Sequence, residues 1–309
     1  MTEGKAVFPP ISYLVLGGSS FVGEHLVAAK RDGDTVVATY RSNPQPGMVA
    51  FDSCSDSVDA LIDRHGPFDH AVILLGDTQP DSCFADPVRS QELNVDSIIR
   101  LIDRLVALGV RPLFTSSEFV FDGAKGDYEE GDRAEPILLY GAQKLEVERH
   151  LESVSDDFTI LRLAKVYGIK PGDRTFFTGL LDMVSSRSQA PCASDQRFSP
   201  IWVGDVIAAI LASMEQRLSG TYHVGGPVGM SRIELLDLLL AEARNFKSIE
   251  FTPQPCSILD FDLPEKRPLD VSMRSDKLSR ASGIAPMHPA DACRRICKTA
   301  YQSMDRTIT

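Results

Sequence analysis

The chain has 309 residues, of which 43% are hydrophobic and 24% are charged, as is ordinary for a water-soluble globular protein. The formal net charge is −11 and no long basic run occurs, which argues against a nucleic-acid backbone as a partner. No apolar run approaches the ~18 residues of a membrane span, and the N-terminal stretch lacks a secretory apolar core. The six cysteines form no Cys-x-x-Cys motif, so we expect free thiols, no metal site and a cytoplasmic protein.

The first half of the chain alternates short apolar runs with helical patterns. Strands are expected at 12–17, 35–40, 48–51, 70–76, 111–117 and 158–166, and helices at 21–31, 57–65, 87–108 and 140–151. This alternation predicts an α/β fold with a doubly wound parallel sheet. In such a sheet, ligands bind beyond the carboxyl ends of the strands.

After Gly168 the alternation breaks. A helix at 203–216 and a strand at 221–226 are expected to return to the sheet, followed by helices at 231–245 and 289–303, a short strand at 248–252 and a Pro-rich connector at 253–268. We therefore expect a dinucleotide-binding domain at 11–168, to which 201–224 return. A small substrate-binding lobe would comprise 169–200 and 225–309, with the substrate in the cleft between the two.

A glycine-rich loop follows the first strand and opens the first helix. Such a turn lets backbone N–H groups approach a pyrophosphate, and its place after the first strand favours this reading over a plain tight turn. Ser20 stands where the dinucleotide-binding pattern has its middle glycine. The candidate cofactor residues of this loop are Gly17, Ser19, Ser20, Phe21, Val22 and Gly23.

The second strand bears on the choice between NAD and NADP. An NAD site uses an acidic residue about twenty positions after the glycine loop to bind the ribose 2′-hydroxyl. Here the strand ends in Tyr40, Arg41 and Ser42, with no acid. Arg41 could pair with the 2′-phosphate of NADP, or it is a solvated surface residue. Asp52, after the third strand, is either an adenine contact or an acid at a helix N-terminus.

Tyr140 and Lys144 are four residues apart on an expected helix, so their side chains share one face. A phenol has a pKa of about 10, and a nearby ammonium group favours the phenolate and lowers that pKa. A hydroxyl from Ser116 or Ser117, at the end of the preceding strand, could hold a carbonyl oxygen while the phenol donates its proton. A Tyr-x-x-x-Lys pair alone is common by chance, so this interpretation depends on the surrounding strands.

Six segments carry a resemblance to a known family. In chain order they are SSEFVFDG (116–123), PILLYGAQKLEVE (136–148), LRLAKVYG (161–168), DQRFSP (195–200), SGTYHVGGP (219–227) and RPLDVSMRSDKL (267–278). Together they resemble the extended short-chain dehydrogenase/reductases. Within these, the chain is similar to the dTDP-4-dehydrorhamnose reductase branch, whose relatives include the regulatory β subunit of methionine adenosyltransferase.

The resemblance implies a reaction in which hydride passes from NADPH, with NAD less favoured, to C4 of a nucleotide-linked 4-keto sugar. Ser117 would hydrogen-bond the substrate carbonyl and Tyr140 would donate the proton. Lys144 would bind the nicotinamide ribose and lower the pKa of Tyr140. The same resemblance places Leu75, Gly76 and Asn94 beside the cofactor. It also implies a homodimer that pairs through the helices near 87–108 and 139–154.

The chain departs from the family pattern near the substrate. Glu118 and Phe119 stand where the family has Asp and Tyr, and Asp77 follows Gly76 where the family has small residues. The candidates for the sugar or the diphosphate are Ser116, Glu118, Phe119, Gln196, Arg197 and Arg267. Arg forks suit phosphate oxygens, although a surface ion pair is the alternative for each Arg.

Trp202 and His223 are two further candidates for ligand contacts. Trp202 fits the core between the lobes better than a stacking site for a base, and His223 fits a buried strand position. Two rivals to the reductase remain open: a sugar-nucleotide epimerase or dehydratase on the same scaffold, and a non-catalytic regulatory subunit that binds NADP. A dehydratase needs an acid pair beside the Ser/Thr, of which Glu118 supplies half.

Overall fold

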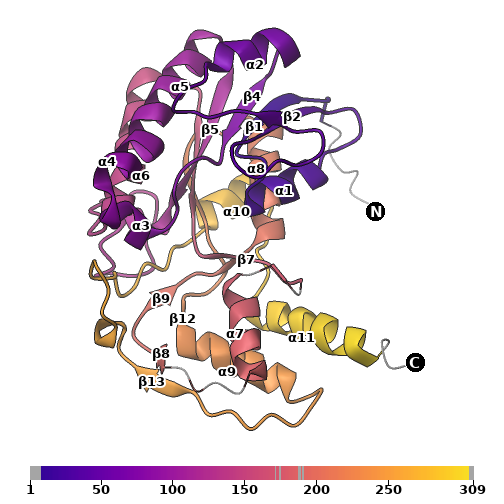
Figure 1. The fold of residues 1–309 in the computed structure, drawn as a ribbon, viewed down its shortest axis with the longest axis vertical. Helices are drawn as coiled ribbons and strands as arrows, with labels where there is room; N and C mark the ends of the chain where they lie inside the picture. Colours follow the sequence, from indigo (N-terminus) through magenta and orange to yellow (C-terminus); the bar gives the residue numbers. More distant parts are fainter. Residues whose placement is uncertain (1–7, 171, 174, 187–188, 190, 306–309) are drawn as a thin grey trace.

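The computed structural model describes residues 8–170, 172–173, 175–186, 189 and 191–305. A seven-stranded parallel sheet forms its upper part, in the order β11-β6-β5-β4-β1-β2-β3 (Figure 1). Its strands are β1 Ser12–Leu16, β2 Thr35–Tyr40, β3 Val49–Ala50, β4 His70–Ile73, β5 Arg111–Ser117, β6 Thr159–Leu163 and β11 Gly220–Val224. The predicted doubly wound parallel sheet is confirmed.

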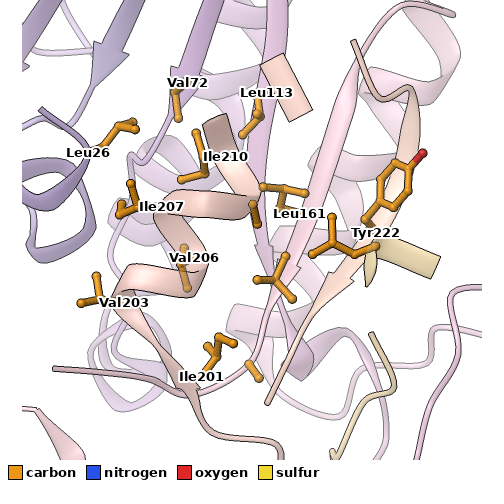
Figure 2. Packing of buried hydrophobic residues seen from close by; sticks show 14 of the residues in the cluster. Leu26, Val72, Leu113, Leu161, Ile201, Val203, Val206, Ile207, Ile210 and Tyr222 are labelled. Atoms are coloured by element: carbon orange, nitrogen blue, oxygen red, sulfur yellow. The ribbon is translucent and has the colours of Figure 1, made fainter. Parts of the chain in front are cut away.

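Helices cover both faces of the sheet because its strands are apolar on both sides. One face carries α1 Phe21–Ala28, α8 Val203–Glu215 and α10 Asp276–Ser282, and the other carries α2 Val58–His65, α5 Ser97–Ala107 and α6 Leu139–Val154. In the first of these layers, α8 packs against the sheet; Figure 2 shows its Val206, Ile207 and Ile210 facing Val72, Leu113 and Leu161 of the strands.

The long helix expected at 87–108 is interrupted in its first half. It consists of α4 Pro87–Gln91, a π-helical turn at Glu92–Asp96, and α5. A further short helix, α3 Pro80–Ala85, precedes it. The π turn matters for the site because it carries Asn94, and such turns are frequent at functional positions.

The lower part of the molecule has its own apolar cluster. Its helices are α7 Phe176–Ser185, α9 Arg232–Ala243 and α11 Pro289–Asp305, and Leu235, Leu239 and Ile296 are among its buried residues. Short strand pairs complete it: β7 Val166–Tyr167 with β10 Ile201–Trp202, β8 Pro191–Ala193 with β13 Gln254–Cys256, and β9 Arg197–Phe198 with β12 Met230–Ser231. Single 3₁₀ turns lie at Glu118–Val120 and Ile258–Asp260.

The prediction of a strand at 248–252 is wrong. The strand of this region is β13 at Gln254–Cys256, inside the expected connector, where it pairs in parallel with β8. Phe251 is buried in the lower cluster without being part of a strand. A short apolar run indicates burial, whereas the position of the neighbouring strand decides which residues pair.

Trp202 joins the two parts of the molecule. Its ring packs against the apolar clusters of both the sheet and the lower part. It also lies over Gly204, where a Cβ would approach the ring to 2.4 Å. The expectation that Trp202 belongs to the core between the lobes agrees with this packing.

His223 is fully buried in β11, and its Nδ1 lies 3.2 Å from the Tyr128 carbonyl oxygen. Across the described residues, no helix combines the length and apolar character needed to cross a membrane.

Candidate active site

A cleft of about 720 Å³ opens at the carboxyl ends of the central strands and extends to the lower lobe. This volume lies within the range of small-molecule and cofactor sites. Twelve of the sequence-predicted site residues line it: Ser20, Phe21, Val22, Leu75, Ser116, Ser117, Glu118, Phe119, Tyr140, Lys144, Gln196 and Arg267. The cleft therefore brings together residues from both halves of the chain.

At one end of the cleft, the glycine loop packs tightly under the start of α1. A Cβ at Gly23 would lie 2.4 Å from the Gly17 carbonyl oxygen, and Gly17 has a φ of +90°. Both positions thus require glycine. Ser20 is the N-cap of α1, and its Oγ accepts a hydrogen bond from the Gly23 N–H at 3.1 Å. Ser20 therefore supports the loop as a cap, while Ser19 beside it is half-buried.

The residues of this loop fit a dinucleotide. The N-terminus of α1 faces the cleft through Ser20, Phe21 and Val22, where aligned N–H groups favour a phosphate. Further along, a Cβ at Gly76 would approach Asn94 Oδ1 to 2.8 Å and Lys144 Nζ to 4.0 Å. With a φ of +123° and Asn94 this close, the position of Gly76 requires glycine.

Ser117, Tyr140 and Lys144 meet at the centre of the cleft. Ser117 ends β5, and its Oγ hydrogen-bonds the Tyr140 phenol and accepts the Phe119 N–H at 3.2 Å. Lys144 Nζ donates to the Thr115 carbonyl oxygen at 3.0 Å and lies 5.9 Å from the centre of the Tyr140 ring. The two hydroxyl groups and the ammonium group thus face one point, as a Ser/Tyr/Lys set requires.

Gly141 explains why α6 can bring Tyr140 so close to β5. A Cβ at Gly141 would lie 1.9 Å from the Phe119 carbonyl oxygen, so only glycine allows the helix to pack here. The Phe119 ring then meets the Tyr140 ring edge to face, with centroids 6.3 Å apart. Gly141 is therefore required for the packing of α6, and this packing positions the Tyr140 phenol.

Burial dominates the electrostatics of this set. Burial raises the pKa of Tyr140 above its ordinary value, and the hydrogen bond from Ser117 offsets this only in part. Burial is thus the dominant influence on the pKa of this phenol, and a lowering of that pKa by Lys144 stays a prediction. Burial also lowers the pKa of Lys144 to about 8, with Glu148 acting against that shift. Glu148 is itself held by Arg162, whose Nη2 lies 2.7 Å from Glu148 Oε2.

Asn94 lies behind Lys144 and fixes the adjoining loop. Its Nδ2 donates to Gln143 Oε1 at 2.9 Å and to the Asp77 carbonyl oxygen at 3.1 Å. Its Oδ1 accepts the Asp77 N–H at 2.7 Å. Asn94 is fully buried and does not line the cleft. It therefore acts on the site by holding α6 and the loop after Gly76 together.

Beside Ser117, two polar side chains are buried with hydrogen-bonding atoms left unsatisfied. Ser116 Oγ and Glu118 Oε2 have no hydrogen-bond partner among the described residues. Burial raises the pKa of Glu118, against the attraction of Lys165 and the Lys165 N–H that its carboxyl accepts. Such unpaired groups in a cleft can be satisfied by a ligand.

Nine predicted site residues do not line the cleft: Gly17, Ser19, Gly23, Gly76 and Asn94, which lie around it, and Arg41, Ser42, Asp52 and Arg197. Arg41 and Ser42 follow β2 at the same edge of the sheet and are exposed. Asp52 accepts the Cys54 N–H at 3.0 Å within a turn, and the N-cap of α2 is Ser57 instead. Arg197 forms an ion pair with Glu234 at 2.8 Å and does not line the cleft. The alternative given above for this residue, an ion pair, therefore agrees with the structure.

Sequence reasoning missed two cations that line the substrate side of the cleft, Lys165 and Arg232. The sequence pattern predicts a strand at 158–166 that includes Lys165, but β6 ends at Leu163, so Lys165 lies at the carboxyl edge where ligands bind. Arg232 opens α9, and only the pairing of Ser231 with Arg197 brings it to the cleft. The described residues hold no group of three or more His, Cys, Asp or Glu arranged for a metal ion.

Comparison with known proteins places this geometry in a family. The model of the RmlD substrate binding domain matches residues 11–302. A dTDP-4-dehydrorhamnose reductase of Sinorhizobium fredii is 28% identical over 81% of this chain and 86% of its own length. The methionine adenosyltransferase 2 subunit beta of Xenopus tropicalis is 31% identical over 64% of this chain and 60% of its own length.

Solved structures support the same fold. The dTDP-4-dehydrorhamnose reductase of Bacillus anthracis, solved in complex with NADP, superposes with a TM-score of 0.82 over 93% of this chain and 98% of its own, at 19% identity. The chain therefore belongs to the RmlD family, the dTDP-4-dehydrorhamnose reductase-like branch of the extended short-chain dehydrogenase/reductases, which are NAD(P)-dependent oxidoreductases.

Proposed function

We propose that the protein reduces a nucleotide-linked 4-keto sugar with NADPH. The observation that carries this proposal is the meeting of Ser117, Tyr140 and Lys144 in a cleft that begins at the glycine loop. Similarity to known proteins supports it, since the Sinorhizobium fredii relative is a dTDP-4-dehydrorhamnose reductase. The lack of an acid at the end of β2, together with Arg41 there, favours NADPH over NADH.

In this proposal each residue has a separate task. When bound, the nicotinamide supplies a hydride to the carbonyl carbon. Ser117 holds the carbonyl oxygen, and Tyr140 donates its proton to that oxygen. The raised pKa of Tyr140 keeps the phenol protonated before the reaction. Lys144, anchored on the Thr115 carbonyl, lies where its charge stabilises the phenolate left behind.

The remaining assignments follow the same scheme. The start of α1 would hold the pyrophosphate, with Arg41 and Ser42 near the 2′-phosphate and Asp52 near the adenine. Gln196 and Arg267 face the substrate side of the cleft. Arg267 is held by Asp81, 2.5 Å from its Nη2. The division into a cofactor domain and a substrate lobe, and a homodimer through α5 and α6, stay predictions.

Replacing Tyr140 by Phe tests the proton donor. We expect kcat/KM for NADPH oxidation with a 4-keto nucleotide sugar to fall by about 100-fold or more, because positioned proton donors contribute that much. Affinity for NADPH should be kept. Tyr13→Phe is the matched control, since that hydroxyl is buried in β1 without a partner among the described residues. A Tyr140→Phe enzyme that keeps nearly full activity would refute the assignment.

The rival with a specific observation behind it is a non-catalytic NADP-binding subunit, because the Xenopus tropicalis relative is a methionine adenosyltransferase subunit. It differs from the reductase in one measurable way. A regulatory subunit would bind NADPH without oxidising it in the presence of any 4-keto nucleotide sugar. Turnover that depends on Tyr140 would exclude this rival.

A further inference from the structure

Lys165 lies next to the point at which the substrate carbonyl would be held. In the parallel register of β5 and β6, Ser117 pairs with Leu163, so Lys165 follows only two residues beyond the partner of Ser117. Its side chain is exposed, and because it lines the cleft this exposure is toward the ligand space. The ammonium group is therefore close to the reacting end of the cleft.

Lys165 has no charge partner in contact. Over the described ranges, no carboxylate lies within 4.0 Å of its ammonium group and no acceptor within hydrogen-bond distance. Burial lowers the pKa of Lys165, and the attraction of Glu118, which is 3% exposed, acts against that shift. Lys165 thus lines the cleft without an ion-pair contact among the described residues.

Arg232 reaches the same space from the lower lobe. Its Nε donates to Gln196 Oε1 at 3.0 Å, and its guanidinium lies 5.4 Å from the centre of the Phe176 ring. These two contacts orient the group, while its terminal nitrogens have no acceptor within the part of the chain that the structure describes. Arg232 and Lys165 line the same cleft, and burial first and then the charge of Arg232 lower the pKa of Lys165.

Two like charges that line one cleft repel each other, and an anion bound between them relieves that repulsion. The sugar of a 4-keto-6-deoxy substrate is uncharged, so with such a substrate only the diphosphate could supply a counter-charge. From the position of Lys165 beside Ser117, we infer that the sugar of the substrate carries a carboxylate, which Lys165 and Arg232 bind together. This inference rests on the proposed function and names the class of its substrate, a nucleotide-linked uronic acid or a related acidic sugar.

Binding of matched pairs of nucleotide sugars tests this inference. UDP-glucuronate against UDP-glucose, and UDP-galacturonate against UDP-galactose, differ only in the carboxylate. With NADP present, isothermal titration should give the acidic sugar an affinity about tenfold or more higher, as expected for charge-assisted hydrogen bonds. This ratio should fall toward one in Lys165→Met and separately in Arg232→Met.

Lys298→Met is the matched control, because Lys298 is exposed on α11 outside the cleft. It should keep the full ratio, and all three variants should keep the NADPH affinity of the parent protein. The binding of UDP alone separates the two sources of negative charge. If Lys165→Met weakens UDP as much as it weakens UDP-glucuronate, the cations serve the diphosphate and the inference is wrong.

The remaining outcomes also decide. Equal affinity for acidic and neutral sugars in the parent protein overturns the inference and leaves the proposed reductase standing. If neither the nucleotide sugars nor UDP and dTDP bind while NADPH does, the proposed function fails, and the inference fails with it.

Discussion

Lys144 shows how a single residue can serve the site at the expense of stability. Only 2% of it is accessible, and burial lowers its pKa from 10.5 to about 8. Between these two pH values the unfolded chain binds more protons at this residue than the folded chain does. The contribution of Lys144 to stability therefore rises with pH from about 8 to 10.5.

Replacing Lys144 by Met should remove this dependence. At pH 7 we expect the cofactor-free variant to be more stable than the parent protein by up to about 3 kcal/mol, since each pKa unit corresponds to about 1.4 kcal/mol. The advantage should shrink as the pH approaches 10.5. Urea unfolding of both proteins at pH 7 and pH 10 measures it. Lys298→Met controls for the loss of one ammonium charge, and a difference that is the same at both pH values would contradict the argument.

At the scale of single elements, the junction between β1 and α1 depends on Gly23. A Cβ at this position would lie 2.4 Å from the Gly17 carbonyl oxygen and 2.6 Å from that of Gly18. Because these contacting atoms belong to the backbone, the clash can be relieved only if α1 moves as a whole. Gly23→Ala should therefore shift α1 away from the loop and weaken NADPH binding by about tenfold or more, as expected when a pre-formed phosphate site is displaced.

Gly179→Ala is the matched control for this prediction. Gly179 lies in α7, is exposed, and a Cβ there would meet nothing within 4 Å. Because Ala is the better helix former, this change should stabilise the protein by about 0.5–1 kcal/mol and leave NADPH affinity unchanged. Fluorescence titration with NADPH measures both variants. Unchanged affinity in Gly23→Ala would show that the loop is not the phosphate site.

The elements of the sheet were predictable from sequence because parallel strands buried on both faces are short apolar runs between helical patterns. The meeting of Ser117, Tyr140 and Lys144 was predictable too, since strand end and helix spacing fix their directions. The π turn around Asn94 was not predictable, because the spacing of apolar residues does not reveal one extra residue within a helical turn. Nor was Arg232, which reaches the cleft through the antiparallel pairing of Ser231 with Arg197, a contact that no local pattern encodes.

At the scale of the whole molecule, Trp202 links the apolar clusters of the sheet and of the lower lobe. It is the single tryptophan of the chain, so its fluorescence reports on this junction alone. Because the two clusters share this contact, we expect both parts to unfold together. In urea, the midpoints from Trp202 fluorescence and from far-ultraviolet circular dichroism should coincide. A fluorescence transition at lower urea would mean that the lower lobe detaches before the sheet melts.

The order of the site residues along the chain has an evolutionary consequence. The groups proposed to handle the proton lie on a stretch that ends at Lys144, whereas Lys165, Gln196 and Arg232 follow it in the chain and line the same cleft. Mutations in the later segments can change which sugar is accepted without disturbing the earlier ones. A gene encoding this scaffold can thus acquire a new specificity by drift or recombination in its second half, while the chemistry inherited in the first half is retained.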